Sequence, residues 1–372
     1  MIVGQRIYSG KTSYINIEKF LTEVGSKRFL LVCDTAFRFL SLQDYFSSLS
    51  VPFSIFQEFH PNPLYEEVCQ GLEIFVKDQC DAIVAIGGGS AIDVAKCIKL
   101  FSGLDPSTNY LQQEFKEANV PLLAMPTTAG TGSESTRFAV IYFKGEKQSI
   151  THESIIPNTV ILYSDSLKTL PLYQKKSTIL DAFCQAIESW WSVNSTNESI
   201  EYSKQAIWRI LQYKDDYLTN GTALARKEIM LASNFAGRAI NISQTTAAHA
   251  MSYKITSLYK IAHGHAVALC LPALWKYMLE KTENCIDSRG VQYLKEVFQS
   301  ISKALGKNSP KEAVEFLYHL FDSFQLEVPK PTEKELDLLV ESVNIVRLKN
   351  NPVLLNRDDI LQLYRRILKQ EV

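Results

Sequence analysis

The sequence predicts two parts of different class: an α/β domain over residues 1–170 and an all-α domain over residues 171–372. Up to about residue 150, short apolar runs alternate with amphipathic stretches, which is typical of a parallel sheet covered by helices on both faces. Further along, apolar residues recur every three to four positions, which is typical of helices. Since a proline disfavours helical geometry in the residue before it, we place the boundary between Leu170 and Pro171.

The strands and helices follow from these patterns. The apolar runs predict strands at 29–33, 53–56, 82–86 and 120–125, with a helix at 64–78 between the second and third. We expect a further strand pair at 138–143 and 160–163, with the turn residues 144–146 after its first member. The helical spacing in the second half predicts helices at 175–192, 198–213, 222–240, 243–258, 264–280, 289–305, 310–324, 333–345 and 357–369.

Composition argues against several classes of partner. Lys and Arg number 39 against 40 Asp and Glu, a net charge of −1, which offers no broad basic surface for a nucleic acid. The chain has no run of about 18 apolar residues, and its first residues lack the layout of a signal peptide. We therefore expect a cytoplasmic protein that binds no membrane. The seven cysteines form no CxxC pair, so we expect mostly buried free thiols.

A glycine-rich turn follows the third predicted strand. Gly87, Gly88, Gly89 and Ser90 precede a helical pattern, with Ser90 as the expected N-cap and Asp93 three residues further on. Glycines let the backbone approach an anion, and the helix end would then face it, so the turn predicts a diphosphate site. The pattern is not GxGxxG, and the alternative is a glycine-rich turn that serves packing alone.

A second loop, over residues 126–136, follows the fourth predicted strand. Its small and hydroxyl-bearing residues would lie at the carboxyl end of a parallel strand, where open α/β sheets bind their ligands. Two such loops in one sheet favour a nucleotide, whereas an exposed Ser/Thr turn is the alternative.

Asp34 ends the first predicted strand, where a carboxylate could accept a hydrogen bond from a ribose hydroxyl and repel a 2′-phosphate. This placement favours NAD(H) over NADP(H). The alternative is an Asp34 that caps the turn beginning at Thr35.

Polar residues at helical spacing predict a metal site in the second half. Asp181 and Gln185 are four residues apart on an otherwise apolar helix, and His249 and Tyr253 repeat this spacing. His263 follows 14 residues after His249. One carboxylate and two imidazoles would suit Zn²⁺ or Fe²⁺, with a position left open for substrate. Taken singly, His249 could instead be a satisfied buried residue, and Asp181 a carboxylate on a helix face or in the first turn of a helix.

Four motifs in order resemble one family, the iron-containing (group III) alcohol dehydrogenases, whose fold is similar to that of dehydroquinate synthase. The motifs are GGGSAIDVAK, PTTAGTGSEST, DAFCQAIESWWS and HAMSYKITSLYKIAHGHA, and the resemblance covers roughly residues 5–370. It implies a dinucleotide-binding α/β domain and a helical metal-bearing domain, commonly in homodimers. It also implies hydride transfer between a nicotinamide and a carbonyl carbon, with the metal as Lewis acid.

The resemblance assigns roles to individual residues. Asp181, His249 and His263 stand where the family has metal ligands, whereas Gln185 stands where histidine is usual and offers a weaker, neutral amide. Tyr253 replaces a histidine implicated in proton relay, and we take Tyr253 and His263 as the catalytic pair. The predicted cofactor-binding residues are Asp34, Gly87, Gly88, Gly89, Ser90, Asp93, Thr127, Thr128, Thr131, Ser133 and Lys147.

Two cations depart from the family pattern and suggest an anionic substrate. Arg137 and Lys254 stand where many members have proline, and an Arg can hold two oxygens of a phosphonate or carboxylate. The alternative is ordinary surface ion pairing. With CQAIESWWSVNST, they resemble the phosphonoacetaldehyde reductase branch, which makes 2-hydroxyethylphosphonate. Three other functions stay open: a dehydrogenase of neutral C3–C4 alcohols, a dehydroquinate-synthase-like lyase, and a cofactor-binding protein without activity.

Overall fold

The computed structural model describes residues 4–343 and 348–368, and its contacts divide the chain into two compact units. One unit holds the residues up to Leu170 together with Gly221–Gly237, and the other holds Pro171–Asn220 together with the residues from Arg238 onward. The predicted domains, 1–170 and 171–372, stay a prediction, because compact contact units do not establish which segments fold independently.

A six-stranded parallel sheet organises the first unit. Its strands are β1 (Arg6–Ser9), β2 (Phe29–Cys33), β3 (Phe53–Phe56), β4 (Ala82–Gly87), β5 (Leu122–Pro126) and β8 (Thr159–Leu162). They lie in the order β1-β8-β5-β4-β2-β3. From β2 the chain runs outward to β3 and then returns to place β4 on the other side of β2. The strand order therefore reverses between β2 and β4, the point where open α/β sheets hold their ligands.

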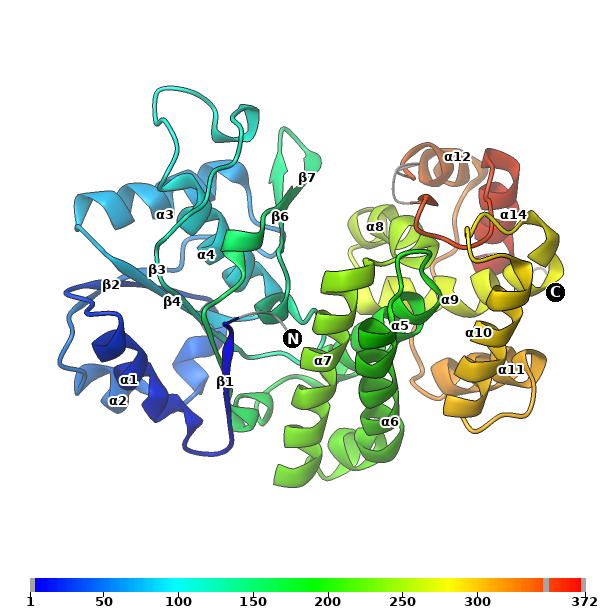
Figure 1. The fold of residues 1–372 in the computed structure, drawn as a ribbon, viewed down its shortest axis with the longest axis horizontal. Coiled ribbons are helices and arrows are strands. Elements are labelled where there is room, and N and C mark those ends of the chain that lie inside the picture. The colour runs from blue at the N-terminus through cyan, green and yellow to red at the C-terminus, as the bar shows by residue number, and fades with distance from the viewer. Residues whose placement is uncertain (1–3, 344–347, 369–372) are drawn as a thin grey trace. The chain divides into compact units, whose positions relative to one another are not determined.

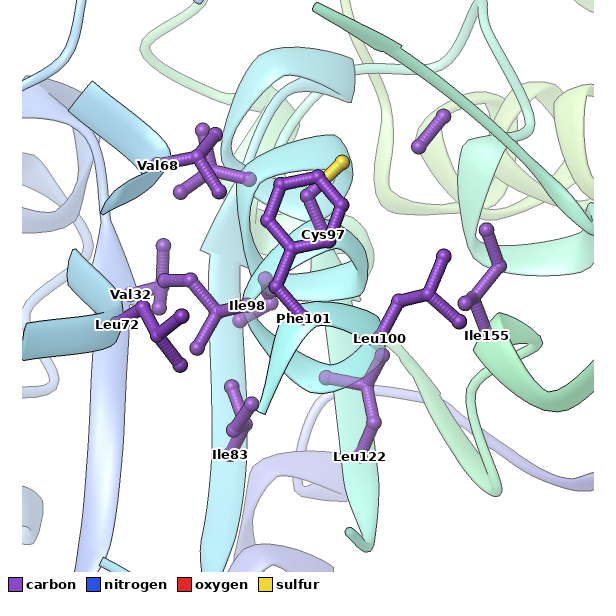
Figure 2. Packing of buried hydrophobic residues seen from close by; sticks show 14 of the residues in the cluster. Val32, Val68, Leu72, Ile83, Cys97, Ile98, Leu100, Phe101, Leu122 and Ile155 are labelled. Atoms are coloured by element: carbon purple, nitrogen blue, oxygen red, sulfur yellow. The ribbon is translucent and has the colours of Figure 1, made fainter. Parts of the chain in front are cut away.

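Helices cover both faces of this sheet (Figure 1), as the near-continuous apolar strands predicted. Alternate strand residues face α3 (Tyr65–Lys77) and α4 (Gly89–Phe101) on one side. The other residues face α1 (Asn16–Glu23) and α2 (Gln43–Ser47). Figure 2 shows the first core, where Val68 and Leu72 of α3 and Ile98 of α4 pack beside strand residues such as Val32 and Ile83. This packing fixes α4, and with it the glycine turn at its start.

The predicted strand pair 138–143 and 160–163 is wrong in its pairing. β6 (Phe138–Phe143) pairs antiparallel with β7 (Glu146–Thr151), which the sequence reading missed, while β8 joins the main sheet beside β5 and β1. Lys144 and Gly145 both have positive φ, of 52° and 80°. Two such residues make the tight turn that joins adjacent antiparallel strands, so the turn signal marked a hairpin.

The second half is helical, as predicted; the described residues there add only an isolated β-bridge between Cys285 and Val353. α7 contributes residues to both units. None of the helices in the described part of the chain is both long and apolar enough to cross a lipid bilayer. The helices are α5 (Leu172–Trp191), α6 (Asn197–Thr219), α7 (Ala223–Ser243), α8 (Ala247–Tyr259), α9 (His263–Glu280), α10 (Val291–Ala304), α11 (Pro310–Asp322), α12 (Glu333–Glu341) and α14 (Arg357–Leu368).

Candidate functional site

Helix α5 carries three buried polar residues on one face. Asp181, Gln185 and Glu188 are spaced by four and then three residues, so their side chains lie one turn above another. Gln185 donates from Nε2 to Asp181 Oδ1 at 3.2 Å. Its side chain therefore lies beside the carboxylate, as the predicted four-residue spacing requires. Its predicted role as a ligand is not tested by this contact.

Glu188, which the sequence reading did not select, holds the beginning of α8. Its Oε1 accepts from the Thr246 hydroxyl at 2.7 Å and from the backbone N–H groups of Thr246 and Ala248 at 3.1 and 3.0 Å. Its Oε2 contacts Nδ1 of His249. A carboxylate is well placed there because the first N–H groups of a helix have no partner within the helix. The seven-residue spacing from Asp181 was the signal that could have revealed it.

The donor atoms of Asp181, His249 and His263 lie within 4.8 Å of one another, although the three residues come from three helices. His249 Nε2 is buried and lies 3.4 Å from Asp181 Oδ1. Since Glu188 engages Nδ1, Nε2 is the nitrogen left for a metal. One carboxylate oxygen and two imidazole nitrogens form a donor set that fits a divalent cation such as Zn²⁺ or Fe²⁺.

The electrostatics of this cluster also suit a cation. Burial would lower the pKa of His249, but the carboxylates of Glu188 and Asp181 raise it to about 9. Burial opposes ionisation of Asp181 too, yet the neighbouring His249 and His263 hold its pKa below the usual value. Asp181 is therefore a buried carboxylate that favours its ionised form, and positive charge beside it is stabilising, which a metal ion would supply.

Tyr253, the other predicted catalytic residue, lies against His263. The two rings are parallel within 5°, with their centroids 5.3 Å apart. The His263 ring also lies 5.4 Å from that of His249. The structure thus brings Tyr253 to the edge of the proposed metal cluster, where its ring stacks on that of His263, the least buried of the three proposed ligands.

In the sheet unit, the glycine turn and Asp34 meet where the strand order reverses. Asp34 Oδ2 accepts from the Gly88 N–H and Oδ1 from the Ala36 N–H, both at 2.9 Å. The capping alternative for Asp34 is therefore realised, and a ribose contact stays a prediction. The predicted N-cap is wrong: α4 begins at Gly89 with Gly88 as its N-cap, because Gly88 keeps extended geometry while Ser90 is already helical.

The two predicted cofactor loops lie side by side. A Cβ at Gly88 would come 3.5 Å from Thr128 Cγ2, and one at Gly89 would come 2.9 Å from Thr131 Cγ2. Thr127 extends this contact, since its N–H donates to the Gly87 carbonyl at 2.9 Å. A side chain at Gly89 would therefore push the loops apart, and glycine keeps the first turn of α4 accessible. The two loops are therefore adjacent, and their binding of one shared ligand stays a prediction.

Lys96, a second residue missed at the sequence level, fixes the end of the second loop. Its fully buried Nζ donates to the carbonyls of Ser133, Thr136 and Phe138 at 2.5, 2.8 and 2.8 Å, and to the hydroxyls of Ser133 and Thr136 at 3.0 and 3.1 Å. Burial lowers the pKa of Lys96 to about 8. Its position three residues after Asp93 was the only hint in the sequence.

Asp93 has a structural partner instead of a place in a capping box. Its Oδ1 accepts from the Ser133 hydroxyl at 2.6 Å and its Oδ2 from the Val140 N–H at 2.9 Å. Burial raises its pKa, while Lys96 and the more distant Lys147 of β7 act against that rise. Asp93, Ser133 and Lys96 thus form one buried chain that ties α4 to the second loop and to β6.

The part of α7 that belongs to this unit, within Gly221–Gly237, packs against the second loop. Asn234 donates to Glu134 Oε1 at 2.9 Å and to Ser135 Oγ at 2.6 Å. Gly132, at φ +59°, lies so close to Gly237 that a Cβ on Gly132 would come 2.5 Å from the Gly237 Cα. Nothing in the local pattern of the loop pointed to this helix, which follows about 100 residues later.

The two predicted anion-binding cations lie in different units. Arg137 forms an ion pair with Glu153, and its guanidinium lies 5.5 Å from the centre of the Phe138 ring. This is the surface ion pair that the sequence left open as the alternative. Lys254 is a half-buried residue of α8, next to Tyr253. A shared anion site for Arg137 and Lys254 stays a prediction.

Comparisons with known proteins cover nearly the whole chain. Residues 4–164 match the family described as iron-containing alcohol dehydrogenase, and residues 175–368 match the C-terminal region of the Fe-containing alcohol dehydrogenase family. A phosphonoacetaldehyde reductase of Streptomyces viridochromogenes is 30% identical over 295 residues, which cover 76% of this chain and 75% of that protein.

Two further matches extend over both units. An NAD-dependent methanol dehydrogenase of Bacillus methanolicus is 27% identical over 371 residues and 94% of each chain. The crystal structure of a sulfoacetaldehyde reductase from Bifidobacterium kashiwanohense in complex with NAD+ superimposes with a TM-score of 0.88 at 25% identity, covering 99% of this chain and 98% of that one.

Proposed function

Because the chain belongs to the iron-containing alcohol dehydrogenase family, and is therefore an NAD-dependent oxidoreductase of small aldehydes or alcohols, we propose that it reduces an anionic aldehyde, with phosphonoacetaldehyde as the first candidate. The observation that carries the reductive chemistry is the convergence of Asp181, His249 and His263 from three helices. The resemblance of the motifs to the family supports these three residues as the metal ligands.

The residues of the helical unit hold the metal ion and orient its ligands in this proposal. Asp181, His249 and His263 would hold the divalent ion, and Gln185 keeps the Asp181 carboxylate in place through its amide. When bound, the metal would supply Lewis-acid polarisation of the carbonyl oxygen and NADH would supply the hydride for the carbonyl carbon. Asp181 and His249 are buried, which strengthens the electrostatic interactions between them and a bound cation.

The residues of the sheet unit bind the dinucleotide in this proposal. The N–H groups at the start of α4, beside Gly88 and Gly89, would donate to the diphosphate, and the positive end of the helix dipole would face its charge. The hydroxyls of Thr127, Thr128 and Thr131 would line the nicotinamide side. Ser133 is already engaged by Lys96 and Asp93, so its part is to hold the loop.

Reduction also adds a proton to the oxygen, and Tyr253 is the proposed donor. Its ring lies parallel to that of His263, a proposed ligand, so its phenol is fixed near the metal cluster. A phenol carries a hydrogen on its oxygen, and it can therefore give a hydrogen bond to the substrate oxygen.

Two relatives support the anionic substrate. The phosphonoacetaldehyde reductase and the sulfoacetaldehyde reductase are named for aldehydes that carry a charged tetrahedral group two carbons from the reacting oxygen. Arg137 is the proposed contact, since a guanidinium can donate two parallel hydrogen bonds to such a group. Its present partner, Glu153, is largely exposed and can be exchanged for a substrate anion at small cost.

Steady-state assays with NADH test this proposal. The value of kcat/KM should be at least about tenfold higher for phosphonoacetaldehyde than for propanal, equivalent to about 1.4 kcal/mol of transition-state binding. Sulfoacetaldehyde, of similar shape but lower charge, separates recognition of an anion from recognition of the phosphonate. Equal values for the charged and neutral aldehydes would contradict an anion site.

A neutral alcohol is the second candidate, because the methanol dehydrogenase relative aligns over 94% of each chain. Oxidation of short alcohols with NAD⁺, at rates that exceed the reduction of every anionic aldehyde, would favour it.

The remaining assignments are part of the same proposal. We propose a homodimer in the cytoplasm, with phosphonate biosynthesis as its setting, NADH as the preferred cofactor through Asp34, and Fe²⁺ or Zn²⁺ as the metal. Elemental analysis after anaerobic purification identifies the metal, light scattering gives the mass in solution, and the ratio of kcat/KM for NADH and NADPH tests Asp34.

A further inference from the structure

We propose that Glu188 is a positioning residue that fixes the tautomer of His249, so that Nε2 of this histidine is the atom available to a metal ion. This inference depends on the proposed metal site but not on the identity of the aldehyde. It goes beyond the ligand set because Glu188 itself stands one helical turn away from Gln185 and two from Asp181.

The two oxygens of Glu188 have different partners. Oε1 accepts from the N–H groups and the hydroxyl at the start of α8, whereas Oε2 contacts His249 Nδ1. The Glu188 side chain is fully buried, so no solvent replaces these partners. Every group around the carboxylate must therefore present a hydrogen to it.

The direction of the Thr246 hydrogen bond is also determined. Trp191 Nε1, which can only donate, gives a hydrogen bond to Thr246 Oγ at 2.9 Å. The Thr246 hydroxyl then turns its own hydrogen toward Glu188 Oε1, at 2.7 Å. Glu188 is thus held as an acceptor through Oε1, and its other oxygen, Oε2, faces His249 Nδ1.

This arrangement specifies the imidazole. When a metal ion displaces the hydrogen of Nε2, the hydrogen on Nδ1 stays with Glu188, and the lone pair of Nε2 faces the side where Asp181 Oδ1 lies 3.4 Å away. Carboxylates that accept from a ligating histidine fix its ring and make it a better ligand, and their removal typically lowers metal affinity about 10- to 100-fold. Glu188 therefore both holds the start of α8 and orients the His249 ring for metal binding.

The isosteric substitution Glu188→Gln separates this role from simple helix capping. Glutamine keeps one acceptor oxygen but adds an NH₂ group, which must face either the donors of α8 or His249 Nδ1. If the oxygen stays with α8, the NH₂ group turns toward Nδ1 and favours the tautomer with its hydrogen on Nε2. That tautomer has no lone pair for the metal.

Glu67 offers a matched control in the other unit. It is also a buried glutamate near the start of a helix, with Oε2 accepting from the Leu64 N–H at 2.8 Å and Oε1 beside His60 Nδ1. Glu67→Gln removes the same kind of interaction from a place remote in sequence from the metal cluster. It should lower stability without changing the affinity for metal.

The test measures binding of Co²⁺ and Zn²⁺ to the metal-depleted full-length protein by competition with a chelating dye. Glu188→Gln should weaken both metals about 10- to 100-fold and change the visible absorption of bound Co²⁺, while Glu67→Gln should leave both unchanged. Asp181→Asn serves as the reference for the metal site. If it binds metal like the wild type, the proposed site itself is wrong.

If Asp181→Asn loses metal but Glu188→Gln keeps wild-type affinity and spectrum, the inference about Glu188 is wrong while the proposed function stands. If Glu188→Gln does not fold, the proposal can still be tested on the zinc-loaded wild type, through the position of the hydrogen on the His249 ring. In long-range ¹H–¹⁵N spectra of the six histidines, the His249 ring should be bound to zinc through Nε2 with its hydrogen on Nδ1, and Asp181→Asn should remove this signal. Zinc on Nδ1 of His249 would overturn the proposal.

Discussion

Gly264 and Asp181 approach so closely that no other residue fits at position 264. A Cβ on Gly264 would come 2.6 Å from Asp181 Cβ and 2.0 Å from the Ser177 carbonyl oxygen. Since His263 precedes this glycine at the start of α9, the contact sets the distance between one proposed ligand on α9 and another on α5.

Gly264→Ala should therefore separate the ligands. Helix α9 must shift away from α5 to admit a methyl group, at a cost of about 1–3 kcal/mol in unfolding free energy. We expect metal affinity to fall by more than tenfold, measured by competition with a chelating dye. Gly103→Ala is the control, because the nearest atom to a Cβ there is 3.9 Å away. Wild-type metal affinity in Gly264→Ala would show that the ligand geometry does not depend on this contact.

Gln185→His should strengthen the metal site. The amide nitrogen of Gln185 lies 3.2 Å from Asp181 Oδ1, so an imidazole at this position would reach the same cluster. A histidine nitrogen is a better ligand for Zn²⁺ or Fe²⁺ than a neutral amide, and we expect at least about tenfold tighter binding. Calorimetry with Zn²⁺ measures it, with Gln185→Ala as the comparison that removes the amide without adding a ligand. Weaker binding in Gln185→His would mean that the site cannot accept a fourth protein ligand.

Lys96 predicts a pH-dependent difference in stability. Its pKa is about 8 in the folded protein against 10.5 when exposed, so between these values the unfolded chain binds more protons and unfolding becomes less favourable as pH rises. Compared with Lys96→Met, the wild type should gain on the order of 3 kcal/mol of unfolding free energy between pH 8 and 10.5. Urea unfolding of both proteins across this range measures the difference. A constant difference would contradict a lowered pKa for Lys96.

Arg137→Ala tests the substrate anion. Loss of a charged hydrogen bond should lower kcat/KM for phosphonoacetaldehyde by a factor equivalent to about 1–3 kcal/mol and leave propanal unaffected. Glu153→Gln is the companion variant, because it removes the carboxylate that now pairs with Arg137. Glu153→Gln should not lower kcat/KM for phosphonoacetaldehyde. If Arg137→Ala lowers kcat/KM equally for phosphonoacetaldehyde and propanal, the residue supports the fold and does not recognise the charge of the substrate.

Much of the fold could be predicted because its signals are local. The buried strands are continuous apolar runs and the helices follow from their spacing, and β2, β3, β4 and the helices predicted in the second half are present near their expected ranges. The last residues of the predicted helices 333–345 and 357–369, which are 344, 345 and 369, lie outside the described residues. The pairing of β6 was wrong and β1 was missed, because β7 is polar and β1 is a four-residue strand at the edge of the sheet. Neither has an apolar pattern that could identify it.

The candidate site divides in the same way. Asp181, His249 and His263 converge as predicted, since helical spacing and family motifs both carry information about them. Glu188 and Lys96 were not selected because their importance comes from partners over 30 residues away: Thr246 and His249 for the first, Ser133 and Thr136 for the second. A lone charged residue in a helix usually faces water, and only the tertiary contacts distinguish these two.

The packing of Gly237 against Gly132 restricts where the chain can be divided into fragments. A recombinant fragment that stops at residue 170 would retain all six strands of the sheet yet lack Asn234 and Gly237, leaving the Glu134 carboxylate without its amide partner. Splitting, permuting or recombining the chain with a homologue should therefore exchange 221–237 along with the first 170 residues. Random libraries at position 132 or 237 should recover glycine at both.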